Sequence, residues 1–548
     1  MTTVAELIIN TLEAAGVKRI YGLPGDSLNP LMDAIRKNGN VKFVQVRHEE
    51  GAALEAAFDS KYTGELSVCM GTSGPGSIHL LNGLYEAKMD HVPVLALTGQ
   101  IETDLTGKEY FQEVDLINLF RDVSLYSQKI VNPDSAYYVL ERAIYIALNS
   151  RGVTHLDLPV DVLRMQTGSK IPDKIPGRVV PDLKPDLSKC RELINQSSKP
   201  LIMYGSGCRN LSEPLMDFAE TIGAPLIYAL KGKGILPDTD SRVMGGLGLL
   251  GTKPSVEAMK KADLLILLGS DFPYTQFLDS GIKTIQVDIN PLSLNKRISP
   301  DRAVMCDISY FLKNINPEKK EEKFYKSLEK DKMNWIKMME KDEQPGGKML
   351  NPEAVVSSLS KHIPQNAIIM GDTGNVTVWT ARNMRFDRKM DFFFSPWLGS
   401  MGTGIPGSIG LSFASERPVY AITGDGSAAM TMVELITAKK YERNVKIVVF
   451  NNSKLGMIKF EEEVMGYPEF GVDLLNPDFE MIGKAVGIGG FTVKNGDELE
   501  DVMEKFVNYS GPAIMNAFVS PDEKPMPPKL NFQQAKGYVT SILRERIG

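Results

Sequence analysis

Short apolar runs rich in β-branched residues alternate with segments of helical periodicity along most of the chain. In the N-terminal stretch MTTVAELIINTLEAAGV, Glu6 and Glu13 interrupt an apolar stripe, which predicts an amphipathic helix rather than a signal peptide. The runs VYAIT at 419–423 and VKIVVF at 445–450 are short and continuous, as expected of buried strands. Because strands that alternate with helices form parallel sheets, the pattern predicts an α/β protein of doubly wound parallel sheets.

Two stretches interrupt this alternation and divide the chain. Four prolines between Pro172 and Pro185 predict an extended linker over 171–187. Residues 317–350 form a charged segment with one apolar face, which predicts a solvated connecting helix. That face consists of Phe324, Leu328, Trp335, Met338 and Met339.

The breaks leave three α/β domains, at 1–170, 188–316 and 351–525, and a C-terminal tail at 526–548. The first and third domains look like versions of one plan. Residues 66–100, LSVCMGTSGPGSIHLLNGLYEAKMDHVPVLALTGQ, and residues 418–452, PVYAITGDGSAAMTMVELITAKKYERNVKIVVFNN, both predict a strand, a glycine-rich turn, a helix and a second strand. Any βαβ unit has this order, so the repeat supports a common plan without establishing it.

The bulk composition narrows the class of protein. A length of 548 residues exceeds what one core supports, while 43% hydrophobic and 24% charged residues are ordinary for a soluble globular protein. A net charge of −6, with basic residues interleaved among acids, argues against nucleic acid as the main partner. No apolar run approaches the roughly 20 residues of a membrane span.

Cysteine and histidine usage gives little sign of a metal site built from these residues. The four cysteines, at positions 69, 190, 208 and 306, are far apart and form no CxxC pair. Buried free thiols in a reducing cytoplasm are therefore expected, rather than disulfides. The five histidines form no HxH or HExxH pattern, so a zinc site made by protein ligands alone is not expected.

The candidate chemistry begins at the GDG turn of 424–426 and the NN pair of 451–452, which follow the two apolar runs. A right-handed crossover makes these strands parallel, so Asp425 and Asn452, 27 positions apart, would lie at the carboxyl edge of one sheet. A carboxylate and an amide oxygen suit Mg²⁺, and the backbone carbonyl of Lys454 would add a third ligand. The glycines let a diphosphate approach the helix N-terminus. An Asp N-cap and an unrelated Asn-rich turn are the competing interpretation.

This arrangement resembles the signature of thiamine-diphosphate enzymes, and the resemblance extends over nearly the whole chain. It implies that the first domain is a pyrimidine-binding (PYR) domain and the third a diphosphate-binding (PP) domain, which together bind thiamine diphosphate and Mg²⁺. The third-domain residues that the resemblance implies are Gly424, Gly426 and Ser427 for the cofactor and Asp425, Asn452 and Lys454 for the metal.

In the first domain, VQVRHEEGAALEAAF places two adjacent acids before a helix of small residues. Alone, these acids predict a solvated first turn stabilised by the helix dipole. Given the resemblance to thiamine-diphosphate enzymes, Glu49 is similar to the family's activating glutamate. That residue is a buried carboxylate that shares a proton with N1′ of the aminopyrimidine. The loops YGLPGDS, GTSGPGSIH and EYFQEVD also resemble first-domain loops of one branch of the family. They contribute Gly25, His79, Phe111 and Gln112 as candidates, and a structural role is the alternative for His79.

The stretch PWLGSMGTGIPG carries two further candidates in the third domain. Met401 is similar to the apolar wedge that bends the cofactor into its V shape. Gly399 would then offer its carbonyl to the 4′-amino group. A methionine packed in the core is the alternative for Met401.

The middle domain contains GLGLLG at 246–251, which fits the dinucleotide pattern GxGxxG. The preceding LPDTDSRVM is not expected to form a strand, which argues against an NAD site there. Four other loops, at 204–209, 230–234, 269–274 and 286–291, resemble those of the FAD-binding middle domain of pyruvate oxidases. GSDFPY and DINP are close to the quinone-reducing type of pyruvate dehydrogenase. The implied FAD contacts are Gly205, Gly207, Arg209, Lys233, Ser270, Asp271, Phe272, Asp288 and Asn290.

Acetolactate synthases share these motifs and also bind FAD, so the reaction needs another signal. After NN their pattern has Gln-Trp, whereas this chain has SKLGMIKFEEE, with Met457 and Ile458 as candidate cofactor contacts and no tryptophan. Glu461 resembles an active-site acid of pyruvate oxidases. The resemblance thus implies oxidative decarboxylation of pyruvate to acetate or acetyl phosphate, with electrons passing to FAD and then to a quinone or O₂. A carboligase of the acetolactate synthase type with structural FAD, and a noncatalytic binding relative, remain alternatives.

The family's site lies between the first domain of one subunit and the third of another, which implies at least a homodimer and usually a tetramer. The tail QQAKGYVTSILRERIG resembles the start of a lipid-binding segment, without that segment's longer continuation. The expected location is cytoplasmic, with at most weak contact with the inner face of the membrane. Tyr538, Val539, Ile542 and Leu543 would either pack on the core or form a weakened surface anchor.

Overall fold

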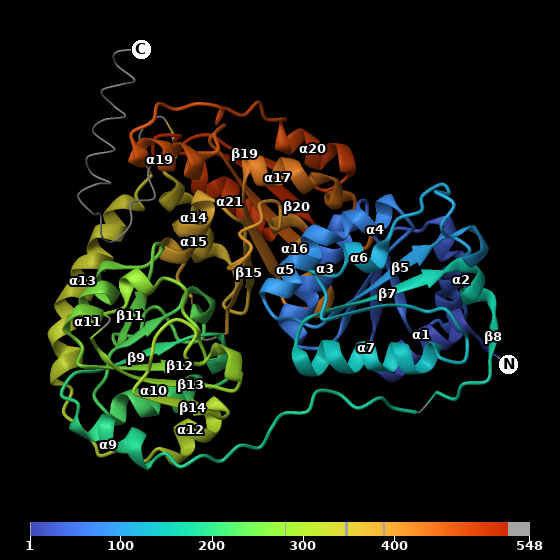
Figure 1. The fold of residues 1–548 in the computed structure, drawn as a ribbon. Helices are drawn as coiled ribbons and strands as arrows, with labels where there is room; N and C mark the ends of the chain where they lie inside the picture. The colour runs from blue at the N-terminus through green and yellow to red at the C-terminus, as the bar shows by residue number, and fades with distance from the viewer. Residues whose placement is uncertain (1, 172, 280, 346–348, 387–388, 524–548) are drawn as a thin grey trace.

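The computed structural model describes residues 2–171, 173–279, 281–345, 349–386 and 389–523. The predicted tail at 526–548 lies outside these residues. Three sheets of six parallel strands form the three bodies of Figure 1, with the first domain in blue, the middle domain in green and the third in orange to red. The predicted fold class, three parallel-sheet α/β domains, is confirmed. No helix among the described residues combines the length and apolarity that crossing a bilayer requires.

The first sheet has the strand order β3-β2-β4-β5-β7-β6. Its strands are β2 (Arg19–Gly22), β3 (Lys42–Gln45), β4 (Ser67–Gly71), β5 (Val94–Gln100), β6 (Tyr126–Lys129) and β7 (Val153–Pro159). Its α-helices are α1 (Val4–Ala14), α2 (Asn29–Asn38), α3 (Glu49–Thr63), α4 (Pro75–His79), α5 (Leu81–Met89), α6 (Leu116–Leu119), α7 (Ala136–Ser150) and α8 (Val160–Arg164). The short strands β1 (Thr2–Thr3) and β8 (Gln166–Thr167) pair beside it. The predicted N-terminal helix is α1, and a Thr3–Glu6 capping box begins it.

The third sheet has the order β16-β15-β17-β18-β20-β19. Numbered in chain order within their own sheets, its strands and those of the first sheet follow the same sequence, 2-1-3-4-6-5. The strands are β15 (Ile368–Gly371), β16 (Asp391–Phe393), β17 (Val419–Gly424), β18 (Val445–Asn451), β19 (Gly489–Val493) and β20 (Ala513–Phe518). The α-helices are α14 (Pro352–His362), α15 (Asn375–Asn383), α16 (Gly404–Ala414), α17 (Asp425–Thr431), α18 (Leu435–Lys440), α19 (Gly456–Met465), α20 (Phe479–Val486) and α21 (Leu499–Asn508). The common plan seen in the sequence is therefore a shared topology.

The middle sheet has the order β11-β10-β9-β12-β13-β14, or 3-2-1-4-5-6 in chain order. Its strands are β9 (Pro200–Tyr204), β10 (Leu226–Tyr228), β11 (Val243–Gly246), β12 (Leu264–Leu268), β13 (Lys283–Asp288) and β14 (Arg302–Met305). Its α-helices are α9 (Ser188–Gln196), α10 (Ser212–Thr221), α11 (Lys253–Lys261) and α12 (Ile308–Asn314). The expectation that no strand precedes Gly246 is wrong, because β11 pairs with β10 there. Nevertheless, β11 is an edge strand, far from the centre of the sheet where the strand order reverses.

Short 3₁₀ turns complete the element list: η1 (Asp26–Leu28), η2 (Thr103–Leu105), η3 (Ser206–Cys208), η4 (Leu230–Gly232), η5 (Thr275–Phe277), η6 (Pro291–Ser293) and η7 (Met432–Glu434). Helix α13 (Lys323–Asp342) follows the middle domain and packs its apolar face on that domain's core. Phe324, Leu328 and Met339 are buried, whereas Met338 is exposed. Adjacent residues on a helix point about 100° apart, so Met338 and Met339 do not share one face.

The first and third domains of one chain contact each other directly through α3 and α16 (Figure 1). Both helices are rich in glycine, alanine and serine, which lets their backbones approach closely. A Cβ atom added at Gly410 would lie 2.3 Å from the carbonyl oxygen of Glu55. This contact brings the start of α3, with Glu49, against the third domain.

Candidate active site

Strands β17 and β18 lie side by side and parallel, with Gly424 opposite Phe450. Asp425 therefore starts α17 at the carboxyl edge of the sheet, close to the end of β18. Its side chain is only 3% exposed. One carboxylate oxygen, Oδ1, accepts a hydrogen bond from Gly426 N at 2.9 Å. The other, Oδ2, accepts bonds from Ser453 N and Asn476 Nδ2, both at 2.7 Å.

Asn452 and Lys454 lie on the turn that follows β18. The amide oxygen of Asn452 accepts a hydrogen bond from Lys454 N at 3.0 Å. The Lys454 ammonium pairs with Asp473 at 2.6 Å and also with Glu469, so its side chain is engaged away from the turn. Burial raises the pKa of Asp425, although its hydrogen-bond donors oppose the shift. A bound cation would favour the ionised carboxylate, so this donor set fits Mg²⁺.

Two asparagines that the sequence did not single out complete this edge. Asn476 donates to both Asp425 Oδ2 and Asn451 Oδ1, the second at 3.0 Å. Asn375 begins α15, and its buried Oδ1 has no hydrogen-bond partner among the described residues. Its Nδ2 lies only 2.6 Å from where a Cβ on Gly456 would stand, next to Asn452. An orphaned polar atom beside the predicted diphosphate position is consistent with a bound polar group.

The loop that carries Gly399 and Met401 is held by Asp372, another residue that the sequence analysis missed. The buried Asp372 carboxylate accepts backbone hydrogen bonds from three consecutive residues, 402–404, at 3.1, 3.3 and 2.9 Å. Gly399 has a φ of +65°, a left-handed conformation that favours glycine. The Met401 methyl group lies 3.4 Å from the position of a Cβ on Gly426. The loop thus brings Met401 to the start of α17.

A second group of candidates surrounds Glu49 in the first domain. Glu49 is the first residue of α3 and is 5% exposed. Its Oε2 lies 3.0 Å from His79 Nδ1, at the end of α4. The His79 ring stacks on that of His48, with centroids 4.3 Å apart. The structure therefore brings Glu49 and His79 together and adds His48, which no sequence motif singles out beyond its place before Glu49.

The other first-domain candidates border this group unequally. Gln112 has a φ of +62°, and its Oε1 accepts a hydrogen bond from Ser73 Oγ at 3.3 Å, just before α4. Gly25 lies against Thr72, on the neighbouring loop. The Phe111 side chain is 74% exposed. Thus Gly25 and Gln112 pack on the loop that leads to His79, whereas Phe111 projects outward from the chain.

Two hydrogen bonds between side chains link the start of α3 to the Met401 loop within the same subunit. Glu50 Oε1 accepts a hydrogen bond from Asn82 Nδ2 at 2.6 Å. The same Asn82 group lies 3.1 Å from Ser400 Oγ, between Gly399 and Met401. The first and third domains of one chain are therefore fixed relative to each other beside both groups of candidates.

In the middle domain, the strand order reverses between β9 and β12, and ligands of open α/β sheets bind at such a point. The two loops there pack backbone against backbone: a Cβ on Gly205 would lie 2.6 Å from Gly269 O, and one on Gly207 would lie 2.7 Å from Gly269 Cα. Ser270 follows directly and also touches Gly205. Open α/β sheets hold a dinucleotide in a crevice outside this point, and the two glycine-rich loops meet at the corresponding place here, called the crevice below.

The acids predicted to contact FAD lie around this crevice. Asp271 pairs with Lys296 at 2.9 Å, and its carbonyl accepts a hydrogen bond from Arg297 Nε at 2.8 Å. Burial, reinforced by the Asp271 charge, raises the pKa of Asp288. Asn290 caps η6 by accepting a hydrogen bond from Leu292 N.

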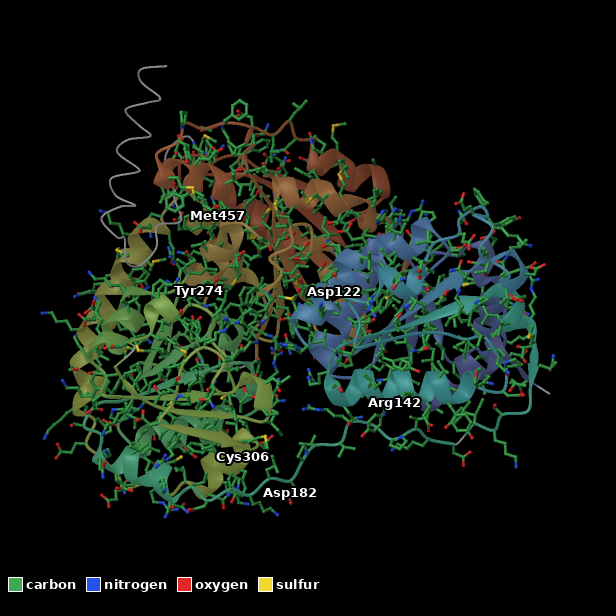
Figure 2. The ribbon with its side chains drawn as sticks, in the orientation of Figure 1. Asp122, Arg142, Asp182, Tyr274, Cys306 and Met457 are labelled. Carbon is green, nitrogen blue, oxygen red and sulfur yellow. The ribbon has the colours of Figure 1, made fainter. Side chains whose placement is uncertain are left out.

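Aromatic residues flank the same crevice. Phe272 is buried, and its ring meets the edge of Tyr274, which Figure 2 labels in the middle domain. The guanidinium of Arg297 lies 5.2 Å from the ring of Trp397, on the Met401 loop. The crevice is therefore connected to the third domain, through a tryptophan that the sequence analysis did not single out.

The two basic candidates of the middle domain are engaged elsewhere. Arg209 pairs with Asp391 of the third domain at 3.0 Å. Lys233 is buried and pairs with Asp238 at 2.7 Å. Burial lowers the pKa of this lysine, against the opposing effect of Asp238. Both cations are therefore already paired with acids.

Helix α19 begins at Gly456, beside Asn452 and Asn375. Met457, labelled in Figure 2, packs half-buried against the core of the third domain. Ile458 and Glu461 are exposed on the following turns of the helix. Ser427, at the other side of the edge, is buried and donates to Thr373 O at 3.4 Å.

Comparisons with known proteins agree with this arrangement. Three stretches match family descriptions: residues 2–119 match "Thiamine pyrophosphate enzyme, N-terminal TPP binding domain", residues 187–315 match its "central domain" and residues 372–517 its "C-terminal TPP binding domain".

Relatives align over nearly the whole chain. YdaP of Bacillus subtilis, named provisionally as a thiamine pyrophosphate-containing protein, is 36% identical over 99% of this chain and 96% of its own. A pyruvate oxidase of Lactiplantibacillus plantarum is 32% identical over 98% and 91%. An acetolactate synthase of Mycobacterium bovis is 30% identical over 96% and 89%.

Proposed function

The chain belongs to the thiamine pyrophosphate enzymes, and on that premise we propose that it oxidatively decarboxylates pyruvate. The products are CO₂ and acetate, whose new oxygen comes from water, or acetyl phosphate when inorganic phosphate takes that place. Two electrons pass to FAD and then to a quinone or to O₂. The relative named as a pyruvate oxidase, aligned over 98% of the chain, supports this choice of reaction.

The observation that carries the proposal is the composition of α19. This helix starts against Asn452 and Asn375, so its first turns border the predicted cofactor edge. It presents Glu461 and no tryptophan. The three tryptophans of the chain lie elsewhere, at positions 335, 379 and 397, on α13, α15 and the Met401 loop. An acid without the ketoacid-selecting tryptophan favours oxidation over carboligation.

The geometry supports the following cofactor roles. Thiamine diphosphate, when bound, supplies an electron sink for loss of CO₂ from a 2-ketoacid, and FAD accepts the two electrons. Asp425, Asn452 and the Lys454 carbonyl would hold Mg²⁺, which would neutralise the charge of the diphosphate. Glu49, buried and in contact with His79, exchanges a proton with the aminopyrimidine. Met401 would support the bound cofactor from the apolar side.

We assign FAD to the crevice between β9 and β12. Gly205, Gly207 and Gly269 carry no side chains that would keep a diphosphate from the backbone at this point. Asp271 and Asp288 offer acceptors for the hydroxyl groups of an extended dinucleotide. Arg209 and Lys233 act mainly in ion pairs with Asp391 and Asp238, which hold the middle domain's own loops and its contact with the third domain.

Carboligation of two ketoacids is the second candidate, because a relative named as an acetolactate synthase aligns over 96% of the chain. One experiment separates the two. The purified protein, loaded with thiamine diphosphate, Mg²⁺ and FAD, is mixed with pyruvate without O₂, and the flavin absorbance near 450 nm is followed. Oxidative decarboxylation bleaches the flavin. Unbleached flavin with accumulating acetolactate would establish the carboligase, and absence of cofactor binding would establish a noncatalytic relative.

The Glu49 assignment has its own test. A Glu49→Gln variant is expected to lose about 10²- to 10⁴-fold in the rate of flavin bleaching, since general acid–base groups contribute that much. Glu65→Gln removes an exposed acid of the same domain, paired only loosely with Lys18, and serves as the control. Full turnover of Glu49→Gln would refute the assignment.

We propose a homodimer as the smallest active unit. The third domain exposes Phe470 (86%), Met465, Met481 and the fully exposed Leu475, which supports burial against a second subunit. The four buried free cysteines are compatible with a reducing cytoplasm, where we place the enzyme.

A further inference from the structure

We propose that Glu434 of the third domain positions the Glu49 carboxylate of the first. The inference rests on the proposed function, in which Glu49 exchanges a proton with the cofactor. Glu434 ends the 3₁₀ turn η7 and is only 1% exposed. It belongs to neither the predicted metal edge nor the FAD crevice, so its burial needs another explanation.

The Glu434 carboxylate faces the backbone that directly precedes Glu49. Its Oε1 accepts hydrogen bonds from Arg47 N at 3.1 Å and His48 N at 3.0 Å. Its Oε2 lies 3.2 Å from Arg47 N and accepts a hydrogen bond from Thr437 Oγ1 at 2.5 Å. Backbone N–H groups ahead of a helix have no partner within that helix. An acid from another domain supplies the partner here and fixes the turn.

The fixed turn leads to the Glu49 carboxylate by a short path. His48 caps α3, because its Nδ1 accepts a hydrogen bond from Glu50 N at 3.2 Å. The His48 ring stacks on His79, whose Nδ1 contacts Glu49 Oε2. A shift of the turn would therefore move both the first residue of α3 and the side chain that touches its carboxylate.

Two features show that the fold is shaped around this acid. A Cβ on Gly51 would lie 2.5 Å from Glu434 Oε1, so the first turn of α3 leaves space for the carboxylate. The break between α17 and α18 ends at Glu434, which turns its side chain toward the first domain. In a glutamine the NH₂ group would replace Oε2, so the acceptor that Thr437 Oγ1 and Arg47 N share would be lost.

Glu434→Gln tests the role, and Tyr441→Phe is the matched control. Tyr441 also lies at the end of this helical segment and its hydroxyl accepts a hydrogen bond from Gln45 N at 2.7 Å, so its loss removes a similar interdomain bond away from Glu49. The measured quantity is the rate of hydrogen–deuterium exchange at C2 of bound thiamine diphosphate, by acid quench and NMR. The dissociation constant for thiamine diphosphate is measured by calorimetry.

In Glu434→Gln the exchange rate is expected to fall about 10- to 100-fold, because a displacement on the order of 1 Å has that effect, while the dissociation constant stays within about threefold. Tyr441→Phe retains the wild-type exchange rate. An unchanged exchange rate in folded Glu434→Gln would overturn the proposal, as would an equal fall in Tyr441→Phe.

If Glu434→Gln does not fold, Gly51→Ala decides the matter, since its methyl group displaces an otherwise intact Glu434. A fall in exchange there supports the positioning role, and wild-type exchange overturns it. Slow exchange in the wild-type holoenzyme or an unaffected Glu49→Gln would instead refute the assigned role of Glu49. The failure of the inference and that of the proposed function are thus distinguishable.

Discussion

The Asp425 carboxylate already accepts three hydrogen bonds from the protein, yet burial still raises its pKa. A nearby cation would favour the ionised carboxylate, which burial disfavours. In the wild type, thiamine diphosphate and Mg²⁺ at about 100 times the dissociation constant are expected to stabilise the fold by about 2.7 kcal/mol. We expect Asp425→Asn to abolish that stabilisation, which thermal unfolding with and without the two ligands measures.

Asp501→Asn is the control for this prediction, because Asp501 is exposed and, within the described part of the chain, pairs only with Lys505 on the same helix. It is expected to retain the full ligand-dependent shift. If Asp425→Asn kept the shift as well, the carboxylate would not be a metal ligand.

The sequence predicts some individual site residues and misses others for a physical reason. Asp425 and Asn452 could be placed together because one strand–helix–strand crossover joins them. Asn476 reaches Asp425 from a distant loop, and no local pattern encodes that loop's path. Lys233, which stays a predicted FAD contact, pairs with Asp238 five positions away, because a buried cation takes a nearby acid, and no motif in the sequence indicates this partner.

Strand β7 carries two buried titratable residues with opposing effects on stability. Burial lowers the pKa of His155 to about 3, below the roughly 6.5 of an exposed histidine. Between these two pKa values the unfolded chain binds a proton on His155 that the folded chain does not bind. The contribution of His155 to the free energy of unfolding is therefore complete above pH 6.5 and declines as the pH falls. Burial raises the pKa of Asp157 to about 6, against the effect of Lys129. Between about pH 6 and 4 the folded chain binds that proton, which opposes the loss.

Asp157→Asn is therefore expected to make the acid sensitivity steeper. As the pH is lowered from 6 to 4, the free energy of unfolding of the variant should fall more steeply than that of the wild type, by about 1.4 kcal/mol per pH unit, because the variant lacks the proton that Asp157 binds in the folded chain. Urea unfolding across this range measures it. The exposed Asp134→Asn substitution should leave the wild-type slope, and equal slopes for all three proteins would contradict the assignment.

Helices α3 and α5 meet the other two domains through a buried ion-pair cluster of Lys61, Glu86, Asp90 and Lys231. Lys61 pairs with Glu86 and, at 2.5 Å, with Asp90, which also pairs with Lys231 of the middle domain at 3.0 Å. Glu86 further accepts a hydrogen bond from Ser395 of the third domain at 2.5 Å. The cluster thus joins all three domains.

Lys61→Met would leave two buried carboxylates with too few partners. The expected loss is about 3–5 kcal/mol of unfolding free energy, because removing one partner of a buried pair uncovers the other's charge. Lys88→Met, which breaks the solvent-exposed pair with Asp122, is expected to cost less than about 1 kcal/mol. Urea unfolding measures both losses of unfolding free energy. Similar losses in the two variants would show that the cluster does not stabilise the junction between the domains.

Element boundaries show where sequence patterns stop being informative. The sequence predicts a single helix between the GDG turn and the strand at 445–450, but the chain forms α17, a 3₁₀ turn and α18. Thr431 at the break donates to Gly402 O at 2.9 Å, and Glu434 bonds the first domain. These tertiary contacts override a continuous helical periodicity, and neither partner lies near in sequence.

For the whole molecule, alternating elements predict parallel sheets and the repeat predicts that the first and third domains share a plan. The order of strands within each sheet does not follow from periodicity, because it depends on which edge each crossover joins. The pattern at 246–251 illustrates the limit: it follows a real strand, but that strand is at the edge of the sheet. Its meaning is set by position in the sheet rather than by the motif.

Whether one subunit or two subunits form each active site can be tested directly. If each site combines Glu49 of one subunit with Asp425 of another, a mixture of Glu49→Gln and Asp425→Asn chains contains intact sites, although each variant alone is inactive. Random pairing of equal amounts gives both native residues to about a quarter of the sites, since each contributes by an independent choice of subunit. Co-expression should therefore restore about a quarter of wild-type flavin bleaching. Within one chain, the Glu50–Asn82–Ser400 bonds already join the two domains beside these residues. If that single chain formed the whole site, every site would keep one substitution and co-expression would restore nothing.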